Sequence, residues 1–200
     1  ADIFGVGNSY GFRMLNGQLA FYAGSATPAT AALPQRTWTH IAGYLTWNGS
    51  DDCDLTLYIN GAEADAELNQ NIDPALAAGQ SIFIGNNGHG FLNGFVRNAR
   101  VWSNMPATFN ENIVLANPIN NEAYLLANFP VNETGGATVY NQTIVSGAQN
   151  GTISGSATNQ RFAFYWLDSD GNFLSFDREI LNQATGTYHV WLFDPLGCEF

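Results

Sequence analysis

Residues 37–44 read Thr-Trp-Thr-His-Ile-Ala-Gly-Tyr and begin the stretch that decides the fold. Three similar runs follow it: Leu-Thr-Leu-Tyr-Ile-Asn-Gly at 55–61, Ser-Ile-Phe-Ile-Gly at 81–85, and Asn-Gly-Phe-Val-Arg-Asn-Ala-Arg-Val-Trp at 93–102. Each run alternates apolar and polar residues or is nearly all apolar, and Gly, Asn, Asp or Pro bounds it. Alternation places successive side chains on opposite faces of a strand, so each run has one face to bury. The four runs therefore predict strands of a β-sandwich.

Two Asn-Gly pairs predict the positions of tight hairpins. Asn16-Gly17 joins the alternating runs 10–15 and 18–23, and Asn60-Gly61 follows the second run quoted above. Asn and Gly tolerate the positive φ that two-residue hairpin turns need. The chain is therefore expected to be all-β and antiparallel.

The charge balance excludes several classes of partner. The chain has 17 acidic residues and six basic ones, for a net charge of −11, and all six basic residues are arginine. Phosphate binding needs clustered cations, so neither nucleic acid nor an acidic membrane surface is expected as a partner. No run of about 20 apolar residues is present, so no membrane span is expected.

The four runs, in this order and spacing, resemble the laminin-G-like family of concanavalin A-like jelly rolls. The likeness continues at 125–129 and through 147–155, which implies an antiparallel jelly-roll β-sandwich over residues 1–155. Such domains usually begin earlier, with segments like Phe-Asp-Gly and Thr-Ile-Glu-Ala-Trp-Val, and neither is present here. Either the sequence begins inside the domain, or another polypeptide supplies these strands. A sandwich that lacks them would expose edge strands, which invite pairing.

The composition changes near residue 156. Runs at 161–166, 171–174 and 186–194 are typical of three strands, and they resemble the Ig-like repeats of bacterial surface adhesins. Residues 156–200 are therefore expected to be the start of an Ig-like module, because about a hundred residues are needed to close one. The 200 residues together resemble a segment of a longer multidomain protein.

The best candidate for a metal site is the acidic turn with Asp51, Asp52 and Asp54. Calcium takes six to eight oxygen ligands, and neighbouring carboxylates on a turn supply several. The alternative, which we favour, is an ordinary solvated turn. Asp168, Asp170 and Asn172 alternate like part of a calcium loop, but the later Glu ligand is absent, which favours a plain turn.

The best candidate for a ligand site is the loop with Asn86, Asn87, His89 and Phe91, and Trp47 and Tyr22 are expected near the same rim. Amides form paired hydrogen bonds with sugar hydroxyls, and an exposed aromatic ring stacks on a pyranose. The alternative is that Phe91 packs inward and the asparagines only form turns, for backbone reasons.

Catalysis has little support in the sequence. Glucanases of similar fold carry alternating carboxylates on one strand, but the comparable run 95–101 contains none. No nucleophile, zinc or phosphate-loop motif is present either. His40 alternates with Trp38, so it is expected to share the face of that residue as a structural histidine.

These patterns predict a noncatalytic carbohydrate- or protein-binding adhesion module of a secreted, cell-surface bacterial protein, with calcium as a candidate cofactor. Two alternatives stay open: a structural spacer or secretion cargo, and an accessory part of a carbohydrate-active enzyme. The polar, lysine-free composition and the module type favour secretion. Cys53 and Cys198 are distant in sequence, which favours separate thiols over one disulfide.

Overall fold

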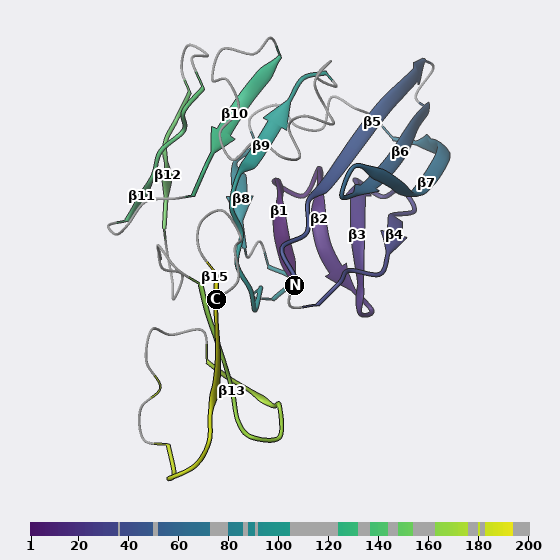
Figure 1. Ribbon diagram of the computed structural model, residues 1–200. Helices are drawn as coiled ribbons and strands as arrows, with labels where there is room; N and C mark the ends of the chain where they lie inside the picture. The colour runs from purple at the N-terminus through teal and green to yellow at the C-terminus, as the bar shows by residue number, and fades with distance from the viewer. Residues whose placement is uncertain are drawn as a thin grey trace.

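A computed structural model describes residues 1–35, 37–49, 52–72, 80–85, 88–90, 92–104, 124–131, 137–143, 148–153, 163–175, 180 and 183–193. Strands and turns make up these ranges, no helix occurs in them, and each strand pair in them is antiparallel (Figure 1). The predicted all-β, antiparallel fold is therefore confirmed. No helix within these ranges is long and apolar enough to cross a membrane.

One five-stranded sheet forms the first layer of the sandwich. Its order is β4-β3-β2-β1-β8, and its strands are β1 (Asp2–Val6), β2 (Tyr10–Leu15), β3 (Gln18–Ala23), β4 (Ala29–Ala31) and β8 (Ile82–Ile84). Leu15 pairs with Gln18 across the tight turn. Asn16 and Gly17 have φ of 51° and 82°, as a primed hairpin turn requires. The predicted β2–β3 hairpin is confirmed.

A three-stranded sheet packs on part of this layer. It consists of β5 (Ile41–Gly49), β6 (Asp52–Ile59) and β7 (Ala62–Asn71), and β6 lies in the middle. Asn60 and Gly61, with φ of 50° and 81°, form the β6–β7 turn. Strand β6 alternates buried and half-buried residues. Its buried residues join those of β1–β3 in one core: Ile3, Phe12, Leu19, Phe21, Ala23, Cys53, Leu55 and Leu57.

A third sheet packs on another part of the same layer. Strand β9 (Ala99–Trp102) pairs with β10 (Leu125–Phe129), and β11 (Thr138–Val139) pairs with β12 (Gly151–Thr152) nearby. Ala99, Ala127, Phe129 and Val139 form a second buried cluster, which packs against Phe4 of β1 and Ile84 of β8. The layer opposite the first sheet is therefore divided into two parts, β7-β6-β5 and β9-β10.

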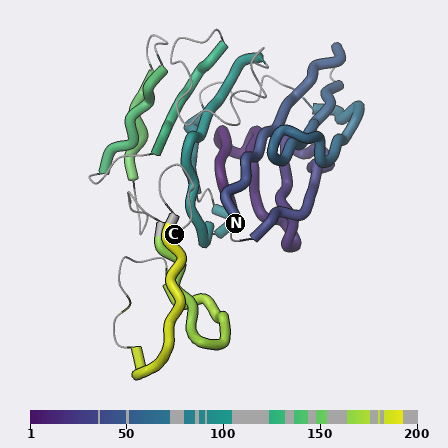
Figure 2. Tube along the Cα trace, viewed as in Figure 1, coloured from purple at the N-terminus to yellow at the C-terminus, as the bar shows by residue number. Residues whose placement is uncertain are grey.

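The last three strands form a sheet of their own. Strands β13 (Ala163–Leu167), β14 (Phe173–Ser175) and β15 (His189–Phe193) pair in the order β14-β13-β15, below the other sheets in Figures 1 and 2. The strands expected after residue 156 are present. Their assignment to an Ig-like module, and the domain boundary at 155/156, remain predictions.

Two strands are shorter than the sequence pattern indicates. Strand β5 begins at Ile41, because the His40 N–H bonds the Asn60 side chain at 2.9 Å instead of a strand backbone. Strand β9 begins at Ala99, because Asn98 has a φ of 53°, which interrupts an extended strand. The helical turn expected at 73–76 and the helix expected at 107–115 lie outside the described residues.

Candidate functional site

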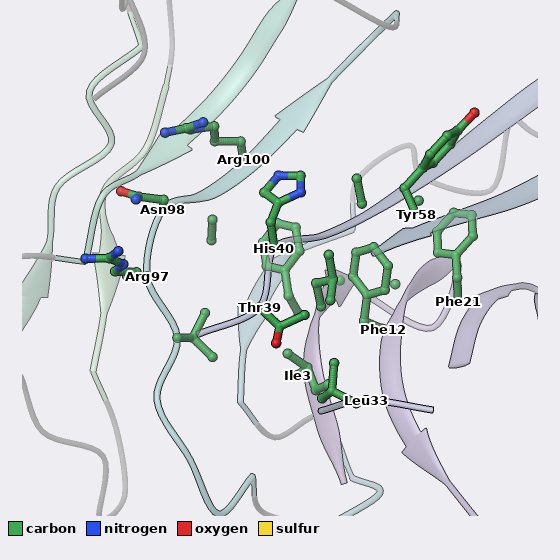
Figure 3. Close-up of a pocket in the computed structure, with 18 of the residues that line it drawn as sticks. Ile3, Phe12, Phe21, Leu33, Thr39, His40, Tyr58, Arg97, Asn98 and Arg100 are labelled. Atoms are coloured by element: carbon green, nitrogen blue, oxygen red, sulfur yellow. The ribbon is translucent and has the colours of Figure 1, made fainter. Parts of the chain in front are cut away.

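A cleft of about 1080 Å³ opens between the two parts of the second layer. Strand β5 lines it on one side, and residues 92–104, which include β9, line it on the other. Its floor is the inner face of the first sheet. Figure 3 shows Ile3, Phe12 and Phe21 at this floor, with Arg97 and Arg100 across from them.

The cleft leaves core-facing apolar side chains partly exposed. Cys53, Leu55 and Leu57 of β6 are at most 1% exposed. In contrast, Ile41 and Leu45 of the neighbouring β5 are only partly buried, although they pack against the same core. A strand in the middle of a sandwich layer normally buries its inner face completely. The β5 edge of the core is therefore incompletely covered.

The side of the cleft formed by residues 92–104 carries positive charge, from Arg97 and Arg100. His40, Arg97 and Arg100 line the cleft, and no Asp or Glu is among the described residues that line it. The Arg97 guanidinium carbon lies 4.7 Å from the centre of the Trp38 ring, a cation–π distance. Burial, and after it the charge of Arg100, lowers the pKa of His40 below 6.5. The cleft is thus a basic site in a protein of net charge −11.

Polar and aromatic groups complete the lining. The amide side chains are those of Gln35, Asn60, Asn93, Asn98 and Asn104, and the aromatic side chains include those of Trp38, Tyr44, Tyr58 and Trp102. Tyr165 and Phe173 from the β13–β14 hairpin also line the cleft, with ring centres 5.0 Å apart. Few polar groups on a mainly apolar surface are typical of a binding site.

His89 of the predicted ligand loop lies against the start of β1. Its backbone N–H donates to the Asp2 carboxylate at 3.1 Å, and its Nδ1 lies 3.2 Å from that carboxylate. Asp2 is fully buried, and the Arg13 Nε lies 4.0 Å from it. The Arg13 guanidinium carbon lies 3.6 Å from the centre of the Tyr22 ring. The structure therefore connects His89 with Tyr22, through Asp2 and Arg13. Asn86, Asn87 and Phe91 lie outside the described residues.

Trp47 lies far from that network. It pairs with Cys53 near the end of β5 and is 47% exposed. Strand β5 runs away from the N-terminus and ends on the opposite side of the molecule in Figure 1. Since His89 contacts Asp2 near the N-terminus, the structure does not bring Trp47 and His89 together.

The acidic turn lies near the Trp47 end of the sandwich. Asp52 pairs with Gly49, and Asp54 pairs with Thr46. The Asp54 Oδ1 accepts the Asn69 N–H at 2.8 Å, and this bond, with a second from the Asn48 side chain, lowers the Asp54 pKa. Asp51 lies outside the described residues. The residues in the described ranges contain no cluster of three or more His, Cys, Asp or Glu suited to a metal ion.

The other two features singled out in the sequence are the cysteines and the turn that begins at Asp168. Cys53 is a buried, free thiol, and burial followed by the nearby Asp54 raises its pKa. Cys198, the other cysteine of the chain, lies outside the described residues. Asp168 accepts the N–H groups of Asp170 at 2.9 Å and Asn172 at 2.8 Å, which is a plain hydrogen-bonded turn.

The basic wall of the cleft was not predicted as a site. Arg97 and Arg100 lie in a run that predicts a strand, and the sequence singles out no binding residue in it. The available signal was the expectation of exposed edge strands in the sandwich.

Residues 2–107 match a laminin G family model described as the concanavalin A-like lectin/glucanases superfamily. No curated protein matches the chain, and no solved structure matches it. The matched range contains β1 to β9, and therefore both strands that flank the cleft.

Proposed function

Because the chain belongs to the concanavalin A-like lectin/glucanase superfamily, we propose that it is a noncatalytic module that binds a carbohydrate or a protein. We further propose that it serves adhesion, as part of a secreted, multidomain protein of a bacterial cell surface. The family match supports a binding module. The composition, which is polar, acidic and free of lysine, suits an exposed module.

The observation that carries this proposal is the cleft between β5 and β9. Its volume of about 1080 Å³ lies just above the usual range for ligand sites, roughly 300–1,000 Å³. It combines an apolar floor with amides, tyrosines and arginines. Amides and guanidinium groups donate to hydroxyl, carbonyl and carboxylate oxygens alike, and aromatic rings stack on sugars or pack on side chains.

A noncatalytic role fits the residue types in the cleft. Glycoside hydrolysis uses two carboxyl groups, about 5–10 Å apart, as nucleophile or base and as acid. The described lining offers neither carboxyl group, and His40 has a lowered pKa next to Arg100. The accessory role in a carbohydrate-active enzyme would place the reacting residues elsewhere. If the protein were a structural spacer, a cleft of this size would have no function.

A binding screen with matched variants tests the proposal. The 200-residue chain is applied to a glycan array and to extracts of surface proteins, and each hit is then titrated calorimetrically. We expect Tyr44→Ala, in the cleft, to weaken binding of the hit at least about tenfold. Trp191→Ala is the control, since this exposed residue lies on β15, outside the cleft lining. Thermal melts verify that both variants fold. Binding of no glycan and no protein would overturn the proposal in favour of a spacer.

Calcium is tested separately, because the acidic turn lies at another end of the sandwich. Calcium is titrated into the metal-stripped chain, and the array is repeated with and without the ion. If the turn holds calcium, Asp52→Asn should abolish uptake, whereas Asp170→Asn should not. Uptake that survives Asp52→Asn would place any calcium elsewhere.

A further inference from the structure

We propose that Tyr165 and Phe173 form an aromatic subsite of the cleft, on which one pyranose ring of a bound oligosaccharide stacks. This inference rests on the proposed binding function, and it assigns part of the ligand specificity to the hairpin β13–β14. The family match ends at residue 107, so both rings lie outside the matched residues. The hairpin therefore adds a contact that the family match does not imply.

The first observation is that the two rings lie together and face the cleft. Tyr165 of β13 and Phe173 of β14 both line the cleft, and their ring centres lie 5.0 Å apart, with the rings at 46° to each other. Phe173 is 36% exposed, whereas Tyr165 is half-buried. A single exposed apolar residue is ordinary, but two adjacent rings in a cleft are a candidate contact surface.

The second observation is that the hairpin holds the rings in place. Leu167, which is 5% exposed, pairs with Phe173 across the hairpin. The Asp168 carboxylate accepts the N–H groups of Asp170 at 2.9 Å and Asn172 at 2.8 Å, and the Asn172 side chain donates to it at 2.9 Å. These bonds close the turn between the two strands. Groups on a preorganised hairpin lose little conformational freedom when a ligand binds.

The third observation is that the subsite is confined to one part of the last sheet. Strand β13 lies between β14 and β15, so Trp191 of β15 pairs with Tyr165 on the side away from Phe173, and Trp191 does not line the cleft. Neighbouring residues on a strand point to opposite faces. Trp166 and its partner Val190 therefore lie on the face opposite Tyr165. Val190 is 44% exposed and does not line the cleft, so it is a matched control.

The fourth observation is the polar chemistry of the cleft, which favours a saccharide. A pyranose presents carbon-bound hydrogens on its faces and hydroxyl groups around its edge. An aromatic ring covers such a face, and the amides of Asn93 and Asn98 and the guanidinium of Arg97, which line the same cleft, are suited to bond hydroxyl groups. The volume of about 1080 Å³ suits a ligand of several linked rings better than a single sugar.

Glycan binding by variants of Phe173 tests the inference. The 200-residue chain is applied to an array of short cello-, chito-, manno- and galacturono-oligosaccharides, and each hit is titrated calorimetrically. We expect Phe173→Ala and Phe173→Leu to weaken binding at least about tenfold, because both lose the ring face. Phe173→Tyr keeps the ring and should retain the affinity. Val190→Ala should leave the affinity unchanged, and thermal melts verify that each variant folds.

Nuclear Overhauser effects in the unaltered chain show where the sugar lies. Ring protons of Phe173 should give intermolecular effects to carbon-bound protons on one face of one pyranose ring of the hit. This readout needs no variant, so it holds even if Phe173→Ala fails to fold. The leucine variant separates stacking from packing, because a merely structural role of Phe173 would be largely preserved by Leu.

The outcomes distinguish this inference from the proposed function. A glycan that Tyr44→Ala weakens and Phe173→Ala does not would overturn the inference and leave the binding function standing. Equal affinity of Phe173→Leu and the unaltered chain would overturn it too, as would the absence of these Overhauser effects. Binding of a protein but of no glycan would also overturn it, with the binding function intact. If neither a glycan nor a protein bound, both proposals would fail.

Discussion

Gly43 of β5 lies directly against the ring of Phe21 of β3, so that a Cβ atom at position 43 would overlap this ring. This contact places β5 close to the first sheet, at the side of the cleft. Gly43→Ala should therefore destabilise the fold by about 1–3 kcal/mol, the usual cost of overpacking. Urea unfolding monitored by tryptophan fluorescence measures the change.

Gly94→Ala is the matched control for this substitution. A Cβ atom there would meet only Leu92, at 3.8 Å, which is an ordinary contact. Its effect should stay within about 0.5 kcal/mol. Similar losses for both glycine variants would show that Phe21 does not restrict position 43.

Asp2→Asn should destabilise the fold by about 1–3 kcal/mol, because it removes the charge that His89 and Arg13 surround. Chemical denaturation of the variant measures the loss. The substitution should cost less in a His89→Ala background, since its partner is then already gone. Asp170→Asn, at an exposed turn, is the control. An additive double variant would contradict the coupling of Asp2 and His89.

The stability of the fold should fall as the pH drops through the range of histidine titration. The pKa of folded His40 lies below its usual 6.5, so between these two values the unfolded chain binds a proton that the folded chain does not. His40 therefore contributes a loss of stability that begins near pH 7.5 and ends at the folded pKa. Denaturation at a series of pH values should show that the free energy of unfolding depends less steeply on pH in the variant His40→Gln than in the unaltered chain. An unchanged slope would contradict this role of His40.

The turn between β13 and β14 should respond to acid but not to calcium. Hydrogen bonds from Asn172, first from its side chain, lower the pKa of Asp168 below 3.8. The amide shifts of Asp170 and Asn172 should therefore change with a midpoint below pH 3.8. Asp168→Asn should abolish this midpoint. A change of the same amide shifts on addition of calcium would instead support a metal loop.

The hairpins could be predicted because their signals are local. Asn16-Gly17 and Asn60-Gly61 adopt positive φ, and the alternation on either side fixes which residues pair. Strand ends were harder to place. Asn98 stops β9 from extending toward residue 94, and nothing in the alternation of that run distinguishes it from a strand residue.

The cleft could be predicted only in part. The sequence led us to expect exposed edge strands, but it did not indicate which strands they are, because strand order is a property of the whole sheet. Arg100 is a candidate binding residue because β9 borders the cleft, whereas the sequence around Arg100 indicates only a strand. Asp2 is similar: an acidic residue at the start of a chain is usually exposed, yet here His89, distant in sequence, covers it.

The central claim is that the second layer is divided, with the edges of β5 and β9 open to the cleft. The most direct measurement is residue-resolved amide exchange of the 200-residue chain without any ligand. The account predicts alternation along β5: Ala42 and Tyr44 exchange slowly, whereas Gly43 and Leu45 exchange at least about tenfold faster. Uniformly slow exchange along β5 would show that a strand already covers this edge, and would contradict the account.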